Sequence, residues 1–335
     1  MSAKILPIIE MIESNTRDHR YPYDPVYKNG IAFTQGEYRP INEAMVPISD
    51  PGFSGADAAY DALCVNDGYI FRLEDHLTRF EESCEKFCLK NPNTRKETKD
   101  ILINMVKSTG LKDAFIWSAV TRGKKRANKS GEIQRFNDAN DYDNQFYAFA
   151  TDYKTVCTDD QRENGIDIMI SKKHTRIPVS SVDSTAKNFL HLDTRMALIE
   201  AREEGYFWCV LPSAEGYLTE APGCNIFAIK DGVVYTPDSN CLEGITRRTV
   251  IELCEGLNIP VQVSKVSLET LLTADEAFLT STAGGVMPID SVDGNVLGGV
   301  KGPGTLTTKL HNLYWKKRLS GWLGTPIDYA QMDVS

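Results

Sequence analysis

Lys187, in the stretch SSVDSTAKNFLHLD, is a candidate for covalent chemistry. A lysine attacks a carbonyl carbon only through its neutral amine, and partial burial favours that neutral form. Lys187 follows Val182-Asp183 and precedes an apolar run, as it would in a loop that enters a helix. The alternative interpretation is one of many solvent-exposed lysines, and the local spacing alone does not decide between the two.

Two later stretches could together form a cradle for a phosphate group. LEGITRRTV predicts a helix with Thr246 as its N-cap, and a helix N-terminus offers unpaired backbone N–H groups and a positive dipole end. Gly244 would let the backbone approach closely there, while Thr246 would supply a hydroxyl group. FLTSTAGGVMPI places Thr282 where a strand meets a turn, with the same capacity. Each stretch alone is a weak signal.

Arg79, in LEDHLTRFEES, is a candidate third part of that cradle, because a guanidinium binds phosphate with paired hydrogen bonds. Leu73, Leu77 and Phe80 recur at helical spacing, and Arg79 lies beside this apolar stripe. From spacing alone, an ion pair with Glu82 is the favoured interpretation. The sequence has no GxGxxG after a strand and no GxxxxGK[ST], which excludes the common nucleotide-binding loops.

In this order, the segments around Arg79, Lys187 and Glu220 (in YLTEAPGCNIF), followed by LEGITRRTV and FLTSTAGGVMPI, resemble the fold type IV pyridoxal-phosphate enzymes. That family includes branched-chain and D-amino-acid aminotransferases, (R)-selective amine transaminases and aminodeoxychorismate lyase. The resemblance runs from about Gly30 to about Tyr314. It implies an α+β fold, with a small α/β N-terminal domain and a larger barrel-like α/β C-terminal domain that binds the cofactor.

The resemblance also implies which residues would bind the cofactor, pyridoxal 5'-phosphate. Lys187 would be the catalytic residue, holding the cofactor aldehyde as a Schiff base and carrying protons. Glu220 would keep the pyridine nitrogen protonated, although a loop glutamate beside a proline is the alternative. The implied cofactor-binding set is Arg79, Lys187, Glu220, Gly244, Ile245, Thr246, Ser281 and Thr282.

The substrate side is less well matched to the family. Tyr60, Trp117 and Ala283 would line the pocket. Arg126 lies where relatives carry a mobile loop whose arginine captures a keto-acid carboxylate, and a solvated Lys-Lys-Arg turn is the alternative. This chain has Gly55 where relatives usually have His, Trp117 where they often have Glu, and KNFLHLD where they have KNxQWGDL. We therefore expect an intact cofactor scaffold with an altered substrate pocket.

The expected reaction is transamination between an (R)-amine or D-amino acid and an α-keto acid such as pyruvate, closest to (R)-selective amine transaminases and D-amino-acid aminotransferases. Within the family the alternatives are a branched-chain L-amino-acid aminotransferase or an aminodeoxychorismate lyase. An alternative of another class is a catalytically silent protein that binds the cofactor or a partner, against which Lys187 and Glu220 argue. The resemblance further implies a homodimer.

Composition excludes several other classes of protein. A net charge of −9 and a pI near 5.2 disfavour nucleic-acid binding through phosphate contacts. The eight cysteines form no CxxC and the five histidines no HxxxH, so we expect no metal site. No apolar stretch approaches the roughly 18 residues that span a bilayer, and the N-terminus lacks a signal-peptide pattern. We expect a cytoplasmic enzyme.

Short strands, Asp-Gly turns and interspersed helices favour an α+β chain with two domains. Asn66-Asp67-Gly68, KDG at 230–232 and VDG at 292–294 predict hairpins. We expect an N-terminal domain over 1–153, with an arm at 1–27, a polar linker at 154–163, and the cofactor-binding domain over 164–335.

Overall fold

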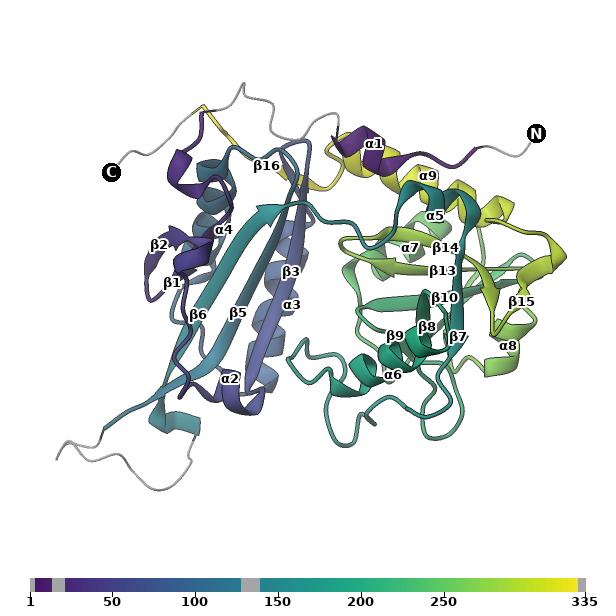
Figure 1. Ribbon diagram of the computed structural model, residues 1–335, viewed down its shortest axis with the longest axis horizontal. Coiled ribbons are helices and arrows are strands. Elements are labelled where there is room, and N and C mark those ends of the chain that lie inside the picture. Colours follow the sequence, from purple (N-terminus) through teal and green to yellow (C-terminus); the bar gives the residue numbers. More distant parts are fainter. Residues whose placement is uncertain (1–3, 14–21, 128–138, 331–335) are drawn as a thin grey trace. The chain divides into compact units, whose positions relative to one another are not determined.

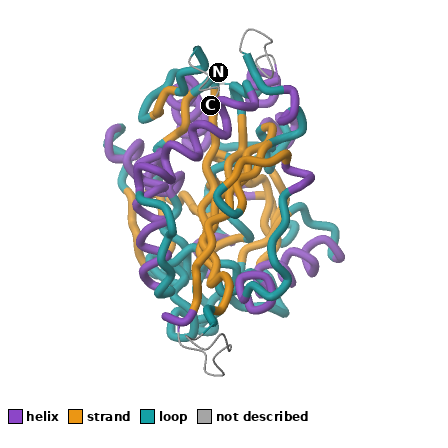
Figure 2. The backbone as a smooth tube through the Cα atoms, turned by 90° about the vertical axis from the view of Figure 1, so that its left-hand side faces the viewer, coloured by secondary structure: helices purple, strands orange, loops and turns teal. Residues whose placement is uncertain are grey.

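A computed structural model describes residues 4–13, 22–127 and 139–330, and divides the chain into two compact units. The N-terminal unit contains residues 14–154, 186–190 and 321–335, and the C-terminal unit contains residues 1–13, 155–185 and 191–320. Strands and helices are interspersed along both (Figures 1 and 2). Most strand pairs are antiparallel, which confirms the expected α+β class.

The N-terminal unit is built on one antiparallel sheet with the strand order β16-β4-β3-β5-β6-β1-β2. Its strands are β1 (Ile31–Thr34), β2 (Glu37–Pro40), β3 (Ala58–Asn66), β4 (Tyr69–Phe71), β5 (Ala114–Lys125), β6 (Tyr142–Asp152) and β16 (Gly324–Pro326). Its helices are α2 (Pro51–Gly55), α3 (Leu73–Lys86) and α4 (Arg95–Thr109), with short 3-10 turns at Pro25–Tyr27, Ile41–Glu43 and Ala139–Asp141.

Alternation along the central strands sorts side chains onto the two faces of this sheet. Leu63 and Val65 of β3 and Ile116 of β5 point to the face that packs on α3 and α4, and all three are fully buried. The hairpin between β3 and β4 turns at Asp67 and Gly68, both with positive φ, so this predicted Asp-Gly turn is confirmed.

The C-terminal unit contains the second sheet, with the order β12-β11-β10-β13-β14-β7-β8 and two short additions, β9 and β15. Its strands are β7 (Ile166–Ile170), β8 (Trp208–Val210), β9 (Glu220–Ala221), β10 (Cys224–Lys230), β11 (Val233–Pro237), β12 (Val261–Ser264), β13 (Glu276–Ser281), β14 (Gly285–Val292) and β15 (Asn295–Val296). Its helices are α1 (Ile8–Glu13), α5 (Asp159–Asn164), α6 (Leu192–Glu203), α7 (Ile245–Gly256), α8 (Leu268–Leu272) and α9 (Thr305–Leu319), with a 3-10 turn at Leu297–Gly299.

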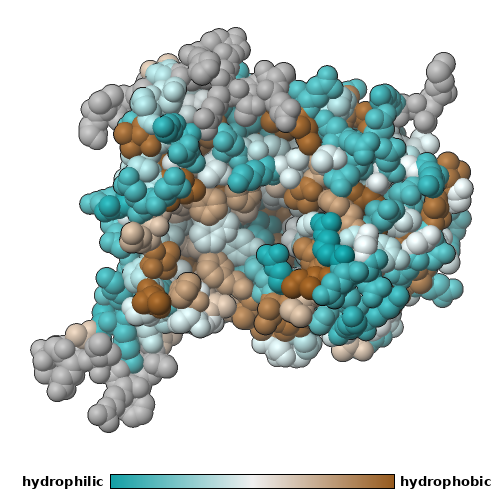
Figure 3. Space-filling model, viewed as in Figure 1, coloured by the Kyte–Doolittle hydropathy of each residue, from teal (hydrophilic) through white to brown (hydrophobic). Residues whose placement is uncertain are grey.

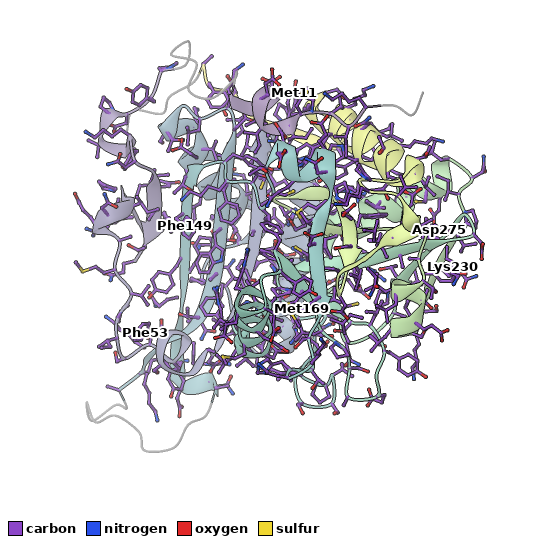
Figure 4. All side chains as sticks on the ribbon, turned by 45° about the vertical axis from the view of Figure 1, so that its right-hand side comes forward. Met11, Phe53, Phe149, Met169, Lys230 and Asp275 are labelled. Atoms are coloured by element: carbon purple, nitrogen blue, oxygen red, sulfur yellow. The ribbon has the colours of Figure 1, made fainter. Side chains whose placement is uncertain are left out.

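The two remaining Asp-Gly turns are confirmed in this unit. Asp231-Gly232 joins β10 to β11 and Asp293-Gly294 joins β14 to β15, with positive φ at all four residues. Lys230 and Asp275, labelled in Figure 4, lie at the tip of the first hairpin, where the Asp275 carboxylate accepts the Asp231 N–H at 2.8 Å.

The segment predicted as a polar linker, residues 154–163, contains most of α5. Thr158 and Gln161 cap that helix reciprocally: each side chain accepts the other residue's backbone N–H. The Asp159 carboxylate in turn accepts the N–H groups of Ile8 and Ile9, which ties α1 to α5. The T-x-x-Q spacing is a helix-start signal that an interpretation based on polarity passes over.

The compact units group the chain differently from the boundaries expected from sequence. Residues 1–13 belong to the C-terminal unit, where Ile5, Ile8 and Ile12 are buried. Residues 186–190 and 321–335 belong to the N-terminal unit, because Ala59 bridges Asn188 and β16 pairs with β4. Each unit therefore gathers segments that are far apart in sequence.

One smaller expectation, the start of α7, is wrong. The N-cap of α7 is Gly244 and not Thr246, which lies in the first turn. A side chain at Gly244 would clash with the Asn225 amide, so this position requires glycine. Arg318, which follows two lysines in the sequence, is buried: its guanidinium lies over the Trp315 ring and donates to the Thr282 carbonyl at 2.9 Å.

Candidate active site

The backbone of Lys187 is fixed on both sides by the N-terminal unit. Its N–H donates to the Ser83 hydroxyl at 3.0 Å, and that hydroxyl donates to the Arg79 carbonyl on α3 at 2.7 Å. Its carbonyl accepts the N–H of Tyr60 on β3 at 3.0 Å. Because both peptide groups are held, the Lys187 side chain starts from a defined point.

The Lys187 amine lies against an aromatic cluster. Its Nζ is 3.1 Å from the Tyr60 hydroxyl and 4.3 Å from the centre of the Tyr60 ring. Trp117 and Phe189 contact Tyr60, and Phe149 of β6, labelled in Figure 4, stacks on Trp117 with ring centres 5.4 Å apart. All five side chains are half-buried, so the structure brings the predicted residues Lys187, Tyr60 and Trp117 together.

Arg79 is buried and pairs with Asp61, not with Glu82. Its Nε and Nη2 donate to the two Asp61 oxygens, both at 2.8 Å, and His76 Nδ1 lies 2.7 Å from Asp61 Oδ1. Burial alone would raise the pKa of Asp61, but Arg79 and His76 lower that pKa well below its ordinary range. Arg79 Nη1 has no hydrogen-bond partner in the described residues, so one donor face remains for an anion.

Glu220 is buried on β9 of the C-terminal unit. One carboxylate oxygen accepts from Arg176 Nε at 2.8 Å, and the other accepts the Leu242 N–H at 2.9 Å. Arg176 also donates from Nη1 to Asp193 at 2.6 Å. This partner set defines the orientation of Glu220 and supports an ionised carboxylate there.

The N-terminus of α7 has the features of an anion site. The backbone N–H groups of Ile245 and Thr246 find no hydrogen-bond partner among the described residues, as expected for the first turn of a helix. The Asn225 amide donates to the Leu242 carbonyl at 2.7 Å and fixes the chain just before that turn. The helix start therefore presents rigid, unpaired donors.

The turn at Ser281–Ala283 joins β13 to β14 in the same unit, and its three residues are half-buried. The Ser281 hydroxyl accepts the Gly284 N–H at 2.9 Å, which closes the turn. Two buried arginines donate hydrogen bonds to carbonyl groups of this segment: Arg162 to the Gly284 carbonyl and Arg318 to the Thr282 carbonyl, each at 2.9 Å.

Arg126 is exposed at the end of β5. Its guanidinium donates to the carbonyls of Asn140 and Tyr142 and pairs with Asp143 at 3.2 Å. Both charged side chains of the pair are more than half exposed, so their attraction is worth about 1 kcal/mol or less. Most of the predicted mobile loop, residues 128–138, lies outside the described residues.

The residues of each unit, considered separately, match chemical groups of pyridoxal phosphate. The N-terminal unit supplies an amine bonded to a phenol and an arginine with a remaining donor. The C-terminal unit supplies a buried carboxylate and a helix start with unpaired N–H groups. An aldehyde, a basic ring nitrogen and a phosphate are the groups that these donors and acceptors match.

Four residues near the predicted ones were not identified from sequence: Ser83, Asp61, Arg176 and Asp193. Ser83 has a local signal, since it lies one helical turn after Arg79. The partners of Asp61 and Arg176 are separated from them by 15 to 44 residues, a distance at which sequence spacing carries no information. Only the fold identifies those two.

Other kinds of site find no support in the part of the chain that the structure describes. No group of three or more His, Cys, Asp or Glu side chains could hold a metal ion there. Within those same residues, no helix is both long and apolar enough to cross a bilayer.

Comparison with known proteins is consistent with this chemistry. Residues 58–292 match the family model described as amino-transferase class IV. The branched-chain-amino-acid aminotransferase-like protein 2 of Arabidopsis thaliana is 31% identical over 92% of this chain, which spans only 54% of that relative's length. The D-alanine aminotransferase of Bacillus licheniformis is 28% identical, over 81% of this chain and 92% of its own.

A solved structure extends the likeness to the fold. The branched-chain amino acid aminotransferase from Thermobaculum terrenum, in its pyridoxal-phosphate form, superposes with a TM-score of 0.78. It is 25% identical and covers 90% of this chain and 99% of its own. The described α+β architecture is therefore that of the fold type IV aminotransferases.

Proposed function

The chain belongs to the class IV aminotransferase family, and from that premise we propose that Lys187 is its catalytic amine and that its donor is an apolar (R)-amine or D-amino acid. Class IV aminotransferases use pyridoxal phosphate, so the chain is a transaminase with that cofactor. The observation that carries the proposal for Lys187 is its fixed backbone together with its contact to Tyr60.

When bound, pyridoxal phosphate supplies an aldehyde that exchanges amino groups and a ring that accepts electrons. Lys187 would bond the aldehyde at rest. Once the donor's amino group has displaced it, the freed Lys187 amine would move a proton from the donor's α-carbon to the carbon of the aldehyde group. The Tyr60 hydroxyl, 3.1 Å from Nζ, would orient the amine for that transfer. Ser83 would keep the amine in reach by fixing the Lys187 peptide.

The remaining predicted residues would bind and polarise the cofactor. Glu220 would accept a hydrogen bond from the protonated ring nitrogen. The N–H groups of Ile245 and Thr246 would bind the phosphate, with further donors from Arg79 and from the turn that contains Ser281 and Thr282. Gly244 would keep the start of α7 open, since no larger residue fits beside Asn225.

The aromatic side chains support a donor with an apolar substituent. Tyr60, Trp117, Phe149 and Phe189 form one continuous half-buried surface beside the Lys187 amine. Burial of an aryl or branched alkyl group against such a surface is favourable, whereas burial of a charged substituent there is unfavourable because it loses hydration. Ala283 would complete the pocket on the substrate side.

The acceptor in this proposal is an α-keto acid such as pyruvate, with Arg126 as the group that captures its carboxylate. To bind it, Arg126 would exchange its ion pair with Asp143, which is exposed and costs little to break, and its hydrogen bonds to the Asn140 and Tyr142 carbonyls for the ligand's carboxylate.

A branched-chain L-amino acid is a second candidate donor, favoured by the names of several relatives, which are branched-chain-amino-acid aminotransferases or proteins like them. Both donors have apolar side chains, so the aromatic surface does not separate them. A panel with both enantiomers of 1-phenylethylamine, alanine and leucine, each with pyruvate and with 2-oxoglutarate, tests the choice. Turnover of only the L-amino acids would replace the first candidate with the second.

Lys187→Ala tests the reaction itself. We expect the purified variant to lose the visible absorbance of the bound cofactor and all turnover, while its circular dichroism stays normal. Tyr60→Phe is the matched variant, which keeps the ring and removes only the hydroxyl, and we expect it to slow turnover by about 10- to 100-fold. If Lys187→Ala keeps both absorbance and turnover, another lysine is the catalytic amine.

A homodimer and a cytoplasmic location complete the proposal. Met45, Ile48 and Phe53 are 74%, 80% and 68% exposed next to α2, where brown side chains gather in Figure 3, and a second copy could cover them. The eight cysteines, all within the described residues, form no disulfide, which suits a reducing compartment.

A further inference from the structure

Glu220 is one member of a buried group of three charges that we call the carboxylate triad: Glu220, Arg176 and Asp193. Arg176 lies in the loop after β7 and donates Nε to Glu220 at 2.8 Å and Nη1 to Asp193 at 2.6 Å. The three side chains are between 9% and 10% exposed. Water therefore screens their charges weakly, and the sum of those charges matters to any ligand beside Glu220.

Asp193 is held as firmly as Glu220. It lies in the first turn of α6, where its Oδ2 also accepts the Ile177 N–H at 3.0 Å and its Oδ1 accepts the Thr194 N–H. Helix α6 itself is packed through Ala197 and Ala201 onto Met169 of β7, labelled in Figure 4. The backbone N–H of Arg176 donates to Pro212. The triad is thus a rigid frame.

The charges of the triad do not cancel. Burial by itself lowers the pKa of Arg176, but the combined effect of Glu220 and Asp193 is larger and raises that pKa overall, so the guanidinium stays protonated. One cation and two carboxylates leave a net charge of −1. A Glu220–Arg176 pair alone would be neutral and would attract a proton on a neighbouring ring only weakly. Asp193 supplies the second negative charge.

We propose that Asp193, acting through Arg176, is a positioning residue that leaves the triad with one net negative charge, so that Glu220 holds a proton on the cofactor's ring nitrogen. The inference rests on the proposed function, in which Glu220 faces that nitrogen. Arg176 orients the Glu220 carboxylate, and Asp193 offsets the positive charge that this orientation introduces. Neither Arg176 nor Asp193 touches the reacting atoms in this proposal.

A charge-balancing role and a merely structural role predict opposite results for a double variant. Asp193→Asn makes the triad neutral and should release the ring proton. Adding Arg176→Gln to Asp193→Asn removes the cation as well, so the net charge returns to −1 and the proton should return. If Asp193 only braces the fold, the second substitution should make the defect worse.

The experiment loads each protein with pyridoxal phosphate labelled with ¹⁵N in the ring and records the nitrogen chemical shift at neutral pH. We expect the shift of a protonated ring in the natural protein, a shift towards the unprotonated position in Asp193→Asn, and recovery in the double variant. A single opposite charge changes a proton-binding constant by about 10- to 1,000-fold. Glu200→Gln is the matched control, because Glu200 is a buried carboxylate on the same helix that bonds Ser171 and not Arg176.

Asp193→Ser is made in parallel as a second neutral variant, in case the asparagine does not fold. An unchanged shift in a folded neutral variant overturns the role of Asp193, as does a double variant with a less protonated ring than the single one. An unprotonated ring in the natural protein, or failure to bind the cofactor, instead overturns the proposed function of Glu220. The two failures are therefore distinguishable.

Discussion

Replacing Arg79 with alanine separates two roles that the structure gives to this residue. Its Nε and Nη2 bond to the buried Asp61, while its Nη1 has no partner within the described residues. The first role stabilises the N-terminal unit, and the second would bind the cofactor phosphate. Arg79→Ala removes both at once, so the measured effects must be divided between stability and cofactor affinity.

The stability cost follows from the buried partner. Without Arg79, the Asp61 carboxylate, which is 1% exposed, keeps its contacts with His76 and with the Ala62 N–H but loses its cation partner. Removal of one partner of a buried ion pair costs about 3–5 kcal/mol, which corresponds to a fall in Tm of roughly 10 °C for a unit of this size. Because the folded pKa of Asp61 lies below its ordinary 3.8, the lost stability is present above that pH in the natural protein and disappears on acidification below it.

The affinity cost follows from the donor that remains. A hydrogen bond to a charged group contributes about 1.5–3 kcal/mol, or roughly a 10- to 100-fold change in dissociation constant. We expect cofactor binding, measured by equilibrium dialysis, to weaken by that factor. Saturating pyridoxal phosphate should restore most of the turnover rate without restoring the Tm measured for the apoprotein.

Arg122→Ala is the matched control for Arg79→Ala. Arg122 is equally buried in the same unit and binds Asp57 through Nε and Nη2, both at 2.8 Å, but its Nη1 is already bonded to the Cys88 carbonyl. It should lose less stability than Arg79→Ala, because its partner Asp57 is 35% exposed and can be rehydrated, and its cofactor affinity should be unchanged. If Arg79→Ala behaves in the same way, Arg79 is structural, and if its Tm does not fall, the energetic argument for the Asp61 pair is wrong.

Three further predictions follow from other parts of the structure. Burial lowers the pKa of His311 from 6.5 to about 4, so on acidification the unfolded chain binds a proton at a higher pH than the folded protein does. The free energy of unfolding should therefore fall by about 3 kcal/mol between pH 6.5 and pH 4. Urea unfolding at a series of pH values should show this fall, and His311→Gln should remove most of it. Arg126→Ala should raise KM for pyruvate at least tenfold yet leave the single-turnover reaction of a neutral amine unchanged; equal damage to both would indicate a structural role. Dilution should abolish activity before far-UV circular dichroism changes, and a fully active monomer in sedimentation would refute the dimer.

Elements with a local signal were predictable from sequence. Each Asp-Gly pair requires positive φ, α3 follows from apolar spacing, and α4 begins at the capping box of Thr94 and Glu97. None of these signals depends on distant parts of the chain. The α5 helix also had a local signal, in the Thr158 capping box, which the polar composition of the segment hid. Arg318 had none, because only the fold places Trp315 and Thr282 around it.

For the candidate site, the residue types were predictable but their partners were not. The order of Lys187, Glu220 and the two glycine-containing stretches identified the family, because chemistry restricts which residues stand at those positions. The ion pairs behind Arg79 and Glu220 join residues 18 and 44 positions apart, and no periodicity links them. Such pairs form only when strands and loops from distant segments are packed together.

The two pairs differ in what they leave for a ligand, and this difference gives each a separate function. Asp61 binds Nε and Nη2 of Arg79, so Nη1 is left as a donor without a partner among the described residues. Asp193 neutralises Arg176, so the carboxylate of Glu220 keeps its charge. Buried ion pairs contribute little net stability compared with well-packed apolar groups, because desolvation opposes their attraction. In the proposed site, the pairs at Arg79 and Glu220 would serve orientation instead: each would hold one group, the Nη1 of Arg79 or the Glu220 carboxylate, in position for the cofactor.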